Sequence, residues 1–482
     1  MRVATTGEDR SLELEGEALR SLIDAAADRI LAHIASLPQQ PATDAEGGAA
    51  LARSLVEPMP ETGRPAEELL DLLFTRVIPK SFNTAGPGYL AYIPGGGLPH
   101  SAVADLISDS VNRYVGVFEA APGLAQLEAN VVRWFADLVG FPPQARGVLT
   151  SGGSLANFSA LVAARRDRLP ENFLSGRMYV SDQSHHSLLK AALLAGFPAA
   201  NVREIPSDPA FRIRVDALER AIAEDRAAGW RPFLVAGNAG TTNTGAVDDF
   251  GALAGLCERE GLWLHADAAY GGFFLLTAEG RRILAGIERC DSIVLDPHKG
   301  LFLPYGTGAL LVRDGETLRR AHAISADYMP RSQEDRDLPD FHLLSPELSR
   351  DVRGLRVWLP LKMHGVGPFR ANLEEKLELA RWAADELRTI PDIEILAEPQ
   401  LSIVAFRRAP PGLSEPELDT RNHAFLDRIN ARMRVFLTGT RLRGRFAIRI
   451  CVLSFRTHRD RMEAALQDIR SAASEDEPED PA

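Results

Sequence analysis

The middle of the chain alternates short apolar runs with amphipathic segments. Between about Gly86 and Gly365, segments such as GVLTSGGSLANFSALVAARRDRL (147–169) place a strand-like run directly before a helix-like stretch. Apolar runs of about four to eight residues bounded by Gly or Pro predict strands, and apolar residues three and four positions apart predict helices. This strand-then-helix repetition predicts an α/β domain built on a mostly parallel sheet.

The two ends of the chain carry different patterns. Apolar residues at helical spacing predict a helix over Glu17–Leu37. The elements predicted after Gly365 are helices at Pro368–Thr389, Glu415–Val435 and Thr457–Ala472, the last with Thr457 as its N-cap, and strands near Ile393–Leu396, Ser402–Arg407 and Arg445–Val452. The predicted organisation is an N-terminal helical extension (1–85), a large α/β domain (86–365), a small C-terminal α+β domain (366–472) and a disordered acidic tail (473–482).

Composition narrows the class of partner. The chain has 482 residues, 45% of them hydrophobic and 25% charged, which is typical of a soluble globular protein with two or three domains. A formal charge of −12 argues against nucleic acid and anionic membranes as partners. No apolar run approaches the ~20 residues of a membrane span, and Cys257, Cys290 and Cys451 lack metal-type spacing. We therefore expect a cytoplasmic protein without a metal site, whose partner is a small molecule or a second copy of the chain.

Four polar clusters follow predicted strands, where α/β sheets bind ligands. They are TSGGS (150–154), SHHS (184–187), HADAAY (265–270) and DPHK (296–299). Each has an ordinary structural interpretation by itself: an N-cap turn, a solvated loop histidine, an acid at a strand end and an exposed lysine. Small residues at a helix N-terminus also suit an anion, and a carboxylate at a buried strand end needs a cationic partner to stay charged.

Lys299 lies between the apolar runs Ser292–Leu295 and Gly308–Val312, where an ammonium is costly to bury. Either its side chain reaches water or its amine reacts. An acid and a lysine on neighbouring strand ends, a loop histidine and a Gly/Ser anion cradle are what a pyridoxal 5′-phosphate site needs. In such a site the acid holds the pyridine nitrogen protonated, the lysine forms the Schiff base and the cradle takes the phosphate.

These motifs resemble one family. With HADAAY and DPHK between GPGYLAYIP (86–94) and LRGRFAIRICVLSFRTHRDRM (442–462), the chain is similar to the group II pyridoxal-phosphate-dependent amino acid decarboxylases, which include aromatic-L-amino-acid, histidine and glutamate decarboxylases. The resemblance implies an aspartate-aminotransferase-type (fold type I) enzyme that removes CO2 from an L-amino acid and releases an amine. It also implies a homodimer with active sites at the subunit interface, to which the N-terminal extension contributes.

The resemblance assigns roles to individual residues. Lys299 matches the Schiff-base lysine, Asp267 the partner of the pyridine nitrogen, and His185 the histidine that stacks on the cofactor ring. The other matching positions are Ala269 on the opposite face of the ring, Gly153, Ser154 and His298 at the phosphate, and Thr242 near the phenolic oxygen. We expect an apolar surround and a nearby cation to lower the pKa of the free Lys299 amine, so that it can move protons in its neutral form.

Three positions depart from the family pattern. Asp296 stands where many members carry an asparagine that contacts the phosphate; a carboxylate would repel the phosphate, so we do not count it as a ligand. Gly116 stands where the aromatic-substrate enzymes carry a pocket phenylalanine, which leaves the substrate side chain open. Anchored on RGLRVW (353–358), Phe341 takes the place of the loop tyrosine that gives a proton to the substrate carbon.

Phe341 opens an alternative, because phenylalanine cannot give a proton. In members of the family with phenylalanine at that position, dioxygen can react instead, giving an aldehyde, ammonia and peroxide after CO2 is lost. Tyr328 and His342 are other candidate proton donors. Plain decarboxylation is the leading hypothesis, and an oxidative aldehyde synthase is the alternative.

Two other classes share parts of this pattern. An aminotransferase would use Lys299 and Asp267 as well, but would need a cation for the substrate carboxylate, for which Arg445 and Arg449 are candidates. A non-catalytic protein that retains only the fold is disfavoured, because Lys299, Asp267 and His185 are all present.

Overall fold

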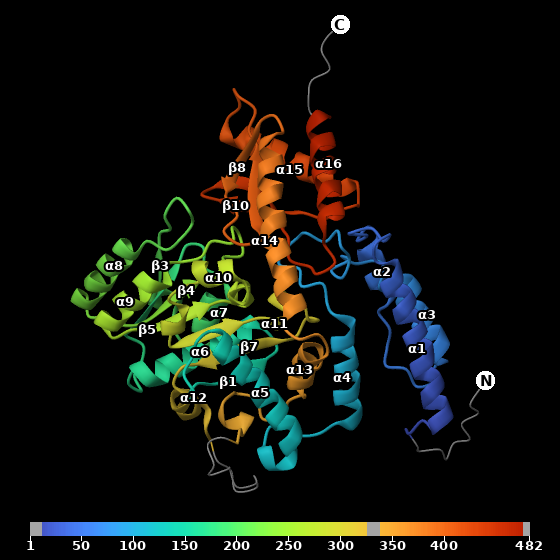
Figure 1. Ribbon diagram of the computed structural model, residues 1–482, viewed down its shortest axis with the longest axis horizontal. Helices are drawn as coiled ribbons and strands as arrows, with labels where there is room; N and C mark the ends of the chain where they lie inside the picture. The colour runs from blue at the N-terminus through green and yellow to red at the C-terminus, as the bar shows by residue number, and fades with distance from the viewer. Residues whose placement is uncertain (1–11, 325–337, 476–482) are drawn as a thin grey trace.

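A seven-stranded sheet forms the centre of the computed structural model, which describes residues 12–324 and 338–475 (Figure 1). The strand order is β1-β7-β6-β5-β4-β2-β3; β7 runs antiparallel to both of its neighbours, and the other pairs are parallel. The strands are β1 (Arg146–Thr150), β2 (Gly176–Ser181), β3 (Val202–Ile205), β4 (Arg231–Asn238), β5 (Trp263–Asp267), β6 (Ser292–Leu295) and β7 (Gly308–Val312). The predicted α/β class and mostly parallel sheet are confirmed.

Helices cover both faces of this sheet. Successive side chains of a strand point to opposite faces, so in β1 Leu149 packs in one hydrophobic cluster and Val148 in another. The first cluster contains α5 (Pro122–Leu138), α8 (Val215–Ala227), α9 (Phe250–Glu260), α13 (Arg353–His364) and the start of α14 (Gly367–Arg388). The second contains α6 (Gly153–Arg168), α7 (Ser187–Leu194) and α12 (Gly315–His322). Helix α4 (Pro99–Val111) packs on α13. The shorter elements are α10 (Ala278–Ile283), α11 (Pro297–Gly300) and the 3-10 turns η2 (Phe118–Ala120), η3 (Ala199–Asn201), η4 (Gly272–Leu276), η5 (Ile287–Arg289) and η6 (Phe341–Leu343).

A second, smaller lobe follows along α14, which reaches from the large sheet into it (Figure 1). Its antiparallel sheet has the order β10-β11-β9-β8. The lobe consists of β8 (Ile393–Ala397), β9 (Ile403–Arg408), β10 (Thr438–Leu442), β11 (Arg445–Cys451), α15 (Glu415–Ala431) and α16 (Arg459–Ser474).

Sequence-based expectations for this lobe were wrong at three points. The strand β10 was not predicted, and α15 ends at Ala431 rather than continuing to Val435. The N-cap residue of α16 is His458, not Thr457. The Thr457 hydroxyl instead donates to the carbonyl of Pro87 at 2.8 Å, which ties the small lobe to the segment before the large sheet.

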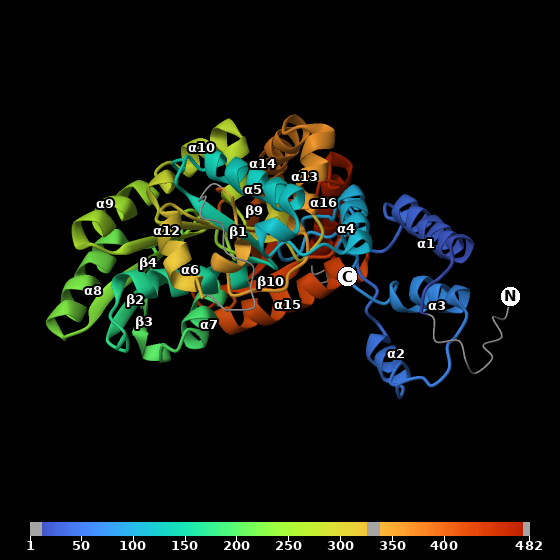
Figure 2. The same cartoon turned by 90° about the horizontal axis from the view of Figure 1, so that it is seen from below.

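The N-terminal helices stand apart from both lobes (Figure 2). They are α1 (Gly16–Ser36), α2 (Gly48–Ser54) and α3 (Ala66–Leu72), which continues into a π-helical turn, η1 (Leu73–Val77). None of the residues of these helices, all of which the structure describes, is buried. Arg29 of α1 pairs with Glu67 and Asp71 of α3 at 2.5 and 2.7 Å. The extension is therefore held together mainly by polar contacts and leaves apolar side chains exposed.

The segment after the extension touches both lobes. The carbonyl of Leu90 accepts from the Cys451 amide of β11 at 2.9 Å, and the Leu98 amide donates to the Phe302 carbonyl at 2.8 Å. A Cβ at Gly95 would lie 2.0 Å from the carbonyl oxygen of His298. Glycine is required here because the segment passes directly against the turn that carries Lys299.

Three global features concern membranes, disulfides and metals. Across residues 12–324 and 338–475, no helix has both the length and the apolar composition of a membrane crossing. The three cysteines are buried and unpaired. In the same ranges, no three His, Cys, Asp or Glu side chains come together as metal ligands would.

Candidate active site

A cavity of about 270 Å³ opens where the parallel strands of the large sheet end. β1, β2, β4, β5 and β6 all present their carboxyl ends at this edge, so the polar clusters that follow them meet there. Eight of the predicted site residues line the cavity: Gly153, Ser154, His185, Thr242, Asp267, Ala269, His298 and Lys299. The separate sequence motifs therefore line one cavity.

The Gly/Ser cluster lies at the start of α6. Gly153 and Ser154 are the first residues of this 16-residue helix, and the first amide groups of a helix have no partner within it. A Cβ at Gly153 would lie 3.3 Å from the Ala269 methyl group and 3.1 Å from Asp296 Oδ2, so glycine keeps this end of the cavity open. Free amides and the positive end of the helix dipole suit a phosphate group. The residues present fit the phosphate of the expected cofactor.

Lys299 lies on α11 and pairs with a carboxylate from its own turn. Its Nζ is 2.9 Å from Asp296 Oδ2, and the Asp296 side chain is only 2% exposed. Burial lowers the pKa of Lys299, but the charge and hydrogen bond of Asp296, together with the charge of Asp267, raise it above the ordinary value of a lysine. The expected lowering of this pKa is wrong, because the neighbouring charge is an acid that faces the amine and not a cation.

His298 is fixed by a backbone contact in the same turn. Its Nδ1 lies 2.6 Å from the carbonyl oxygen of Thr307 and must be the donor, because a carbonyl only accepts. Its Nε2 lies 3.6 Å from Asp296 Oδ2. Burial lowers the pKa of His298, although the Asp296 charge opposes this. Nε2 of the neutral ring then faces the cavity as an acceptor.

Asp267 is oriented by a buried hydrogen-bond chain. Asn157 Nδ2 donates to Asp267 Oδ2 at 3.1 Å, and Asn157 Oδ1 accepts from His265 Nε2 at 2.9 Å. His265 Nδ1 accepts from the Ser292 hydroxyl at 2.8 Å, and this hydroxyl accepts from Trp263 Nε1 at 2.8 Å. Each N–H and O–H of the chain has its own acceptor, and the second N–H of Asn157 Nδ2 donates to the Ser187 hydroxyl, so the chain selects a single tautomer of a neutral histidine. Burial lowers the pKa of His265 to about 4, against the opposing charge of Asp267.

Sequence reasoning missed the members of this chain. His265 precedes Asp267 by two positions, which places both side chains on one face of β5. Asn157 follows Gly153 by four positions, on the side of α6 that bears the cradle. The spacing was visible in the sequence, but no motif marked these residues as polar contacts of the site.

His185 lies beyond the end of β2 on the loop before α7. Its Nδ1 is 2.8 Å from the Ser187 hydroxyl, which also accepts from Asn157 Nδ2 at 2.9 Å. Burial lowers the pKa of His185, and the charge of Asp267 opposes this. The ring is therefore connected, through Ser187 and Asn157, to the same network that orients Asp267.

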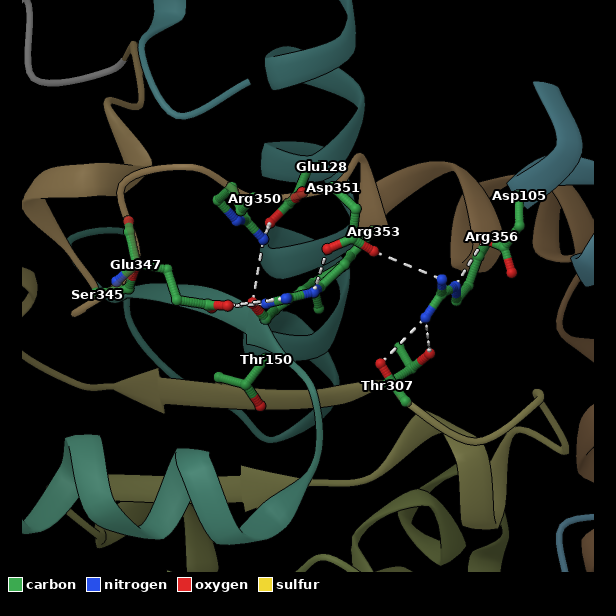
Figure 3. A network of polar contacts seen from close by, with 12 residues as sticks. Asp105, Glu128, Thr150, Thr307, Ser345, Glu347, Arg350, Asp351, Arg353 and Arg356 are labelled. Carbon is green, nitrogen blue, oxygen red and sulfur yellow. Dashed lines mark hydrogen bonds and ion pairs between the residues drawn. The ribbon is translucent and has the colours of Figure 1, made fainter. Parts of the chain in front are cut away.

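Three arginines support the two backbone segments that lead into the site (Figure 3). Arg350 and Arg353 donate to the carbonyl of Leu149, just before the cradle, at 3.0 and 3.2 Å. Arg356 donates to the Gly306 carbonyl at 3.0 Å and to the Thr307 hydroxyl at 3.2 Å, next to the carbonyl that holds His298. Acidic side chains pair with the same guanidinium groups: Glu128 with Arg350, Glu347 and Asp351 with Arg353, and Asp105 with Arg356 (Figure 3).

Phe341 lies apart from these residues. Its side chain is 1% exposed and packs in the core beside α12, with the Arg350 guanidinium 4.9 Å from the ring centre. The neighbouring His342 amide donates to the Gly116 carbonyl at 3.1 Å. Among the described residues that line the Lys299 cavity, neither Phe341 nor His342 occurs. Tyr328, the other candidate proton donor, lies outside the described residues.

The two arginines considered for a substrate carboxylate are engaged elsewhere. Arg449 is 3% exposed and donates to the carbonyls of Thr242 and Tyr92 at 2.6 and 3.0 Å. Arg445 pairs with Glu394 at 3.0 Å. Both side chains therefore stabilise the lobes and do not point a free guanidinium into the cavity.

Comparison with known proteins gives consistent results. A family model described as the pyridoxal-dependent decarboxylase conserved domain matches residues 51–409. An aromatic-L-amino-acid decarboxylase from Bacillus atrophaeus is 35% identical over 467 residues, which covers 96% of this chain and 97% of the relative. A phenylacetaldehyde synthase from Arabidopsis thaliana is 27% identical over 88% of this chain and 89% of its own length. The crystal structure of Oryza sativa TDC with PLP and tryptamine superposes with a TM-score of 0.91 at 26% identity, covering 96% and 99% of the two chains.

Proposed function

Because this chain belongs to the pyridoxal-dependent decarboxylase family and is a fold type I, pyridoxal 5′-phosphate-dependent amino acid carboxy-lyase, we propose that its substrate is an aromatic L-amino acid, converted to CO2 and the amine. One observation carries the assignment of the site: Lys299 and Asp267 line a single cavity that ends at the open N-terminus of α6. The aromatic class rests on the relative that is 35% identical and is an aromatic-L-amino-acid decarboxylase.

The side chains of the cavity divide the work of holding the cofactor and the substrate. Lys299 would hold the cofactor covalently, and Asp267, oriented by Asn157, would accept a hydrogen bond from the protonated pyridine nitrogen. Gly153 and Ser154 would hold the phosphate through the helix N-terminus. His298 lines the same cavity, but its Nδ1 proton is taken by the Thr307 carbonyl, so its Nε2 could donate to the phosphate only in the protonated ring. By the family resemblance, His185 and Ala269 would lie against the cofactor ring and Thr242 near its phenolic oxygen, and all three residues line the cavity. The bound cofactor supplies an electron sink for the carbon that loses CO2.

The aminotransferase alternative has less support than decarboxylation. An aminotransferase keeps the substrate carboxylate by pairing it with a cation, and Arg445 and Arg449 are held by Glu394 and by two backbone carbonyls. Withdrawing Arg449 would leave those carbonyls buried without their donor, which costs about 1–3 kcal/mol each. We therefore propose that the substrate carboxylate is lost and not retained.

The test of this function is a substrate panel. The purified holoenzyme is incubated with each standard L-amino acid, and CO2, amine and peroxide are measured separately. We expect aromatic substrates to give equal amounts of CO2 and amine, without peroxide and without dependence on oxygen. CO2 with stoichiometric peroxide would establish the aldehyde synthase alternative. Keto acid without CO2, formed when a 2-oxo acid is added to accept the amino group, would establish an aminotransferase.

Phe341 provides a second test of the same question. Its ring is buried in the core of its own chain, so we expect Phe341→Tyr to leave the ratio of amine to peroxide unchanged. The added hydroxyl should lower stability by about 1–3 kcal/mol, because it has to fit a packed cluster. Product analysis and thermal unfolding measure the two effects. A switch from aldehyde to amine in the variant would show that residue 341 acts in catalysis and that the native reaction is oxidative.

We also propose a homodimer that uses the N-terminal extension as part of its interface. Helices α1 to α3 have no buried residue, and their apolar side chains are exposed: Leu19 44%, Ile23 41%, Ile30 47%, Leu31 64% and Leu69 41%. α4 exposes Val103, Leu106, Ile107 and Val111 by 41% to 52%. An apolar stripe on one helix face is normally covered, and a two-fold partner with the same surface would cover both sets.

Deleting residues 1–37 should weaken this dimer and loosen cofactor retention. Sedimentation gives the dimer dissociation constant, and absorbance after dialysis gives the bound cofactor. A matched variant, Arg20→Ala, removes an exposed charge of α1 and keeps its apolar stripe, so it should behave like the parent. A truncated chain that remains dimeric and fully active would show that the extension is not part of the interface.

The remaining sequence predictions stay proposals. The break between α13 and α14 supports the predicted domain boundary between residues 365 and 366. Helix α16 continues to Ser474, inside the segment predicted as a disordered tail. Residues 476–482 of that predicted tail lie outside the described residues. A reducing cytoplasmic compartment fits three buried thiols without a disulfide.

A further inference from the structure

Asp296 is a buried carboxylate that faces the phosphate end of the cavity. It directly follows β6, lines the cavity and is 2% exposed. Its Oδ2 contacts Lys299 Nζ at 2.9 Å, while its Oδ1 is buried and has no hydrogen-bond partner within the described residues. Both oxygens lie close to the place where a Cβ of Gly153 would be, at 3.1 and 3.4 Å. The carboxylate therefore stands directly over the first residue of α6.

This position creates a conflict of charge. The start of α6 is the part of the cavity best suited to a phosphate, which is dianionic above its second pKa of about 6. Two anions close together in a buried site cannot both keep their full charge without a high energy. Lys299 now compensates Asp296, but Lys299 gives up this ion pair when its Nζ holds the cofactor. One proton added to the pair of anions removes the conflict and gives Oδ1 a partner.

We propose that Asp296 couples cofactor binding to the uptake of one proton from solvent. The proton binds Oδ1 of the carboxyl group, and the resulting hydroxyl donates to a phosphate oxygen. The inference rests on the proposed function, because it needs the phosphate of pyridoxal 5′-phosphate in the α6 cradle. It assigns to Asp296 the donor role that an asparagine amide fills without a proton, and it makes cofactor affinity fall as pH rises.

Other titratable groups near Asp296 come from several elements. Those of its own turn and the loop after it are His298, Lys299 and Tyr305; Asp267 lies at the end of β5, and His185 lies before α7. Burial lowers the pKa of both histidines, so they stay neutral over the range in which affinity is measured. Every one of these groups is also present in an Asp296 variant. Asp296 also raises the pKa of Lys299, His298 and His185, so the difference between the parent and that variant reports Asp296 together with its effect on these neighbours.

Asp296→Asn should remove the pH dependence that Asp296 causes. Uptake of one proton changes an equilibrium constant about tenfold per pH unit. We expect the ratio of the pyridoxal 5′-phosphate dissociation constants, parent over Asp296→Asn, to rise about tenfold per pH unit between pH 7 and 9. The amide donates without a proton, so Asp296→Asn should bind the cofactor more tightly than the parent at pH 9.

The experiment titrates the apoprotein with pyridoxal 5′-phosphate at pH 7, 8 and 9 and follows the cofactor absorbance. Calorimetry in two buffers of different ionisation enthalpy counts the protons, and the parent should take up one more than Asp296→Asn. Asp296→Ala is the second variant. Its side chain has neither a titratable carboxyl group nor an amide donor, so its cofactor dissociation constant should lose the same pH dependence as that of Asp296→Asn. Asp385→Asn, which changes an exposed carboxylate on α14, should follow the parent. A ratio that is constant with pH, or equal proton counts, overturns the inference.

Borohydride reduction and peptide mapping separate this result from the proposed function. Cofactor trapped on Lys299 in the parent and in Asp296→Asn shows that both use the cavity, whatever their pH dependence. A trapped cofactor with a constant ratio refutes only the proton coupling. A cofactor trapped on another lysine refutes the assignment of the site itself.

Discussion

Lys299→Ala is expected to abolish turnover while the chain keeps its fold. Among the described residues that line the cavity, Lys299 alone carries an amine that can hold the cofactor covalently, and alanine offers no nucleophile in its place. The substitution also removes the cation that faces Asp296 at 2.9 Å, and Asp296 is 2% exposed. A buried charge left without its partner typically costs about 3–5 kcal/mol, so the variant should unfold at a lower temperature than the parent.

The double variant Lys299→Ala/Asp296→Asn separates these two effects. The neutral amide removes the uncompensated charge, so stability should return towards that of the parent while CO2 release stays absent. Lys190→Ala, which changes an exposed lysine on nearby α7, should leave both properties unchanged. CO2 release and thermal unfolding are the measurements. Activity in Lys299→Ala above that of the cofactor alone would disprove the role of this lysine.

The location of the site follows from the sequence because strand ends converge. Lys299, Asp267 and His185 are far apart along the chain, yet each follows or ends a strand of one mostly parallel sheet. Ligands bind at the carboxyl edge of such a sheet, so the order of strands and helices along the chain is enough to place the three residues together. The strands β6 and β7 were predicted with their observed bounds, since both are short, largely apolar runs bounded by Gly, Pro or charged residues.

The predictions that failed depended on contacts with residues far along the chain or on the direction in which a side chain points. Strand β10, TGTRL, has few apolar residues, and it is recognisable only through its pairing with β11. Thr457 is a residue type that often serves as an N-cap, but its hydroxyl donates a hydrogen bond to the carbonyl of Pro87, 370 positions away along the chain. The pKa of Lys299 was expected to be lowered by an apolar surround. The carboxylate of Asp296, three residues earlier, faces the amine and raises this pKa, and the sequence does not show that orientation.

The hydrogen-bond chain behind Asp267 shows the same limit at the centre of the site. Asn157, His265 and Ser292 come from α6, β5 and β6, and no local pattern links them. Their side chains form a continuous series of hydrogen bonds from the Trp263 indole to the Asp267 carboxylate. This series fixes the orientation of the Asp267 carboxylate. This arrangement implies that Asp267 has two separable properties, its charge and its orientation, which different substitutions can test.

Asp267→Asn removes the charge and should lower the rate of CO2 release by about 10²–10⁴-fold, since a neutral amide does not hold the pyridine nitrogen protonated. Asn157→Ala keeps the charge but removes the donor at 3.1 Å, so it should cost much less, and the cofactor should still bind. Turnover at saturating substrate measures the rate, and the absorbance of the bound cofactor shows whether the site is filled.

Asp296→Asn serves as the matched control, because it makes the same chemical change to a second buried carboxylate of the same cavity and should leave most of the activity. Equal losses in the two aspartate variants would contradict the distinct roles assigned to them, and a fully active Asp267→Asn would remove the electron sink from the proposed mechanism.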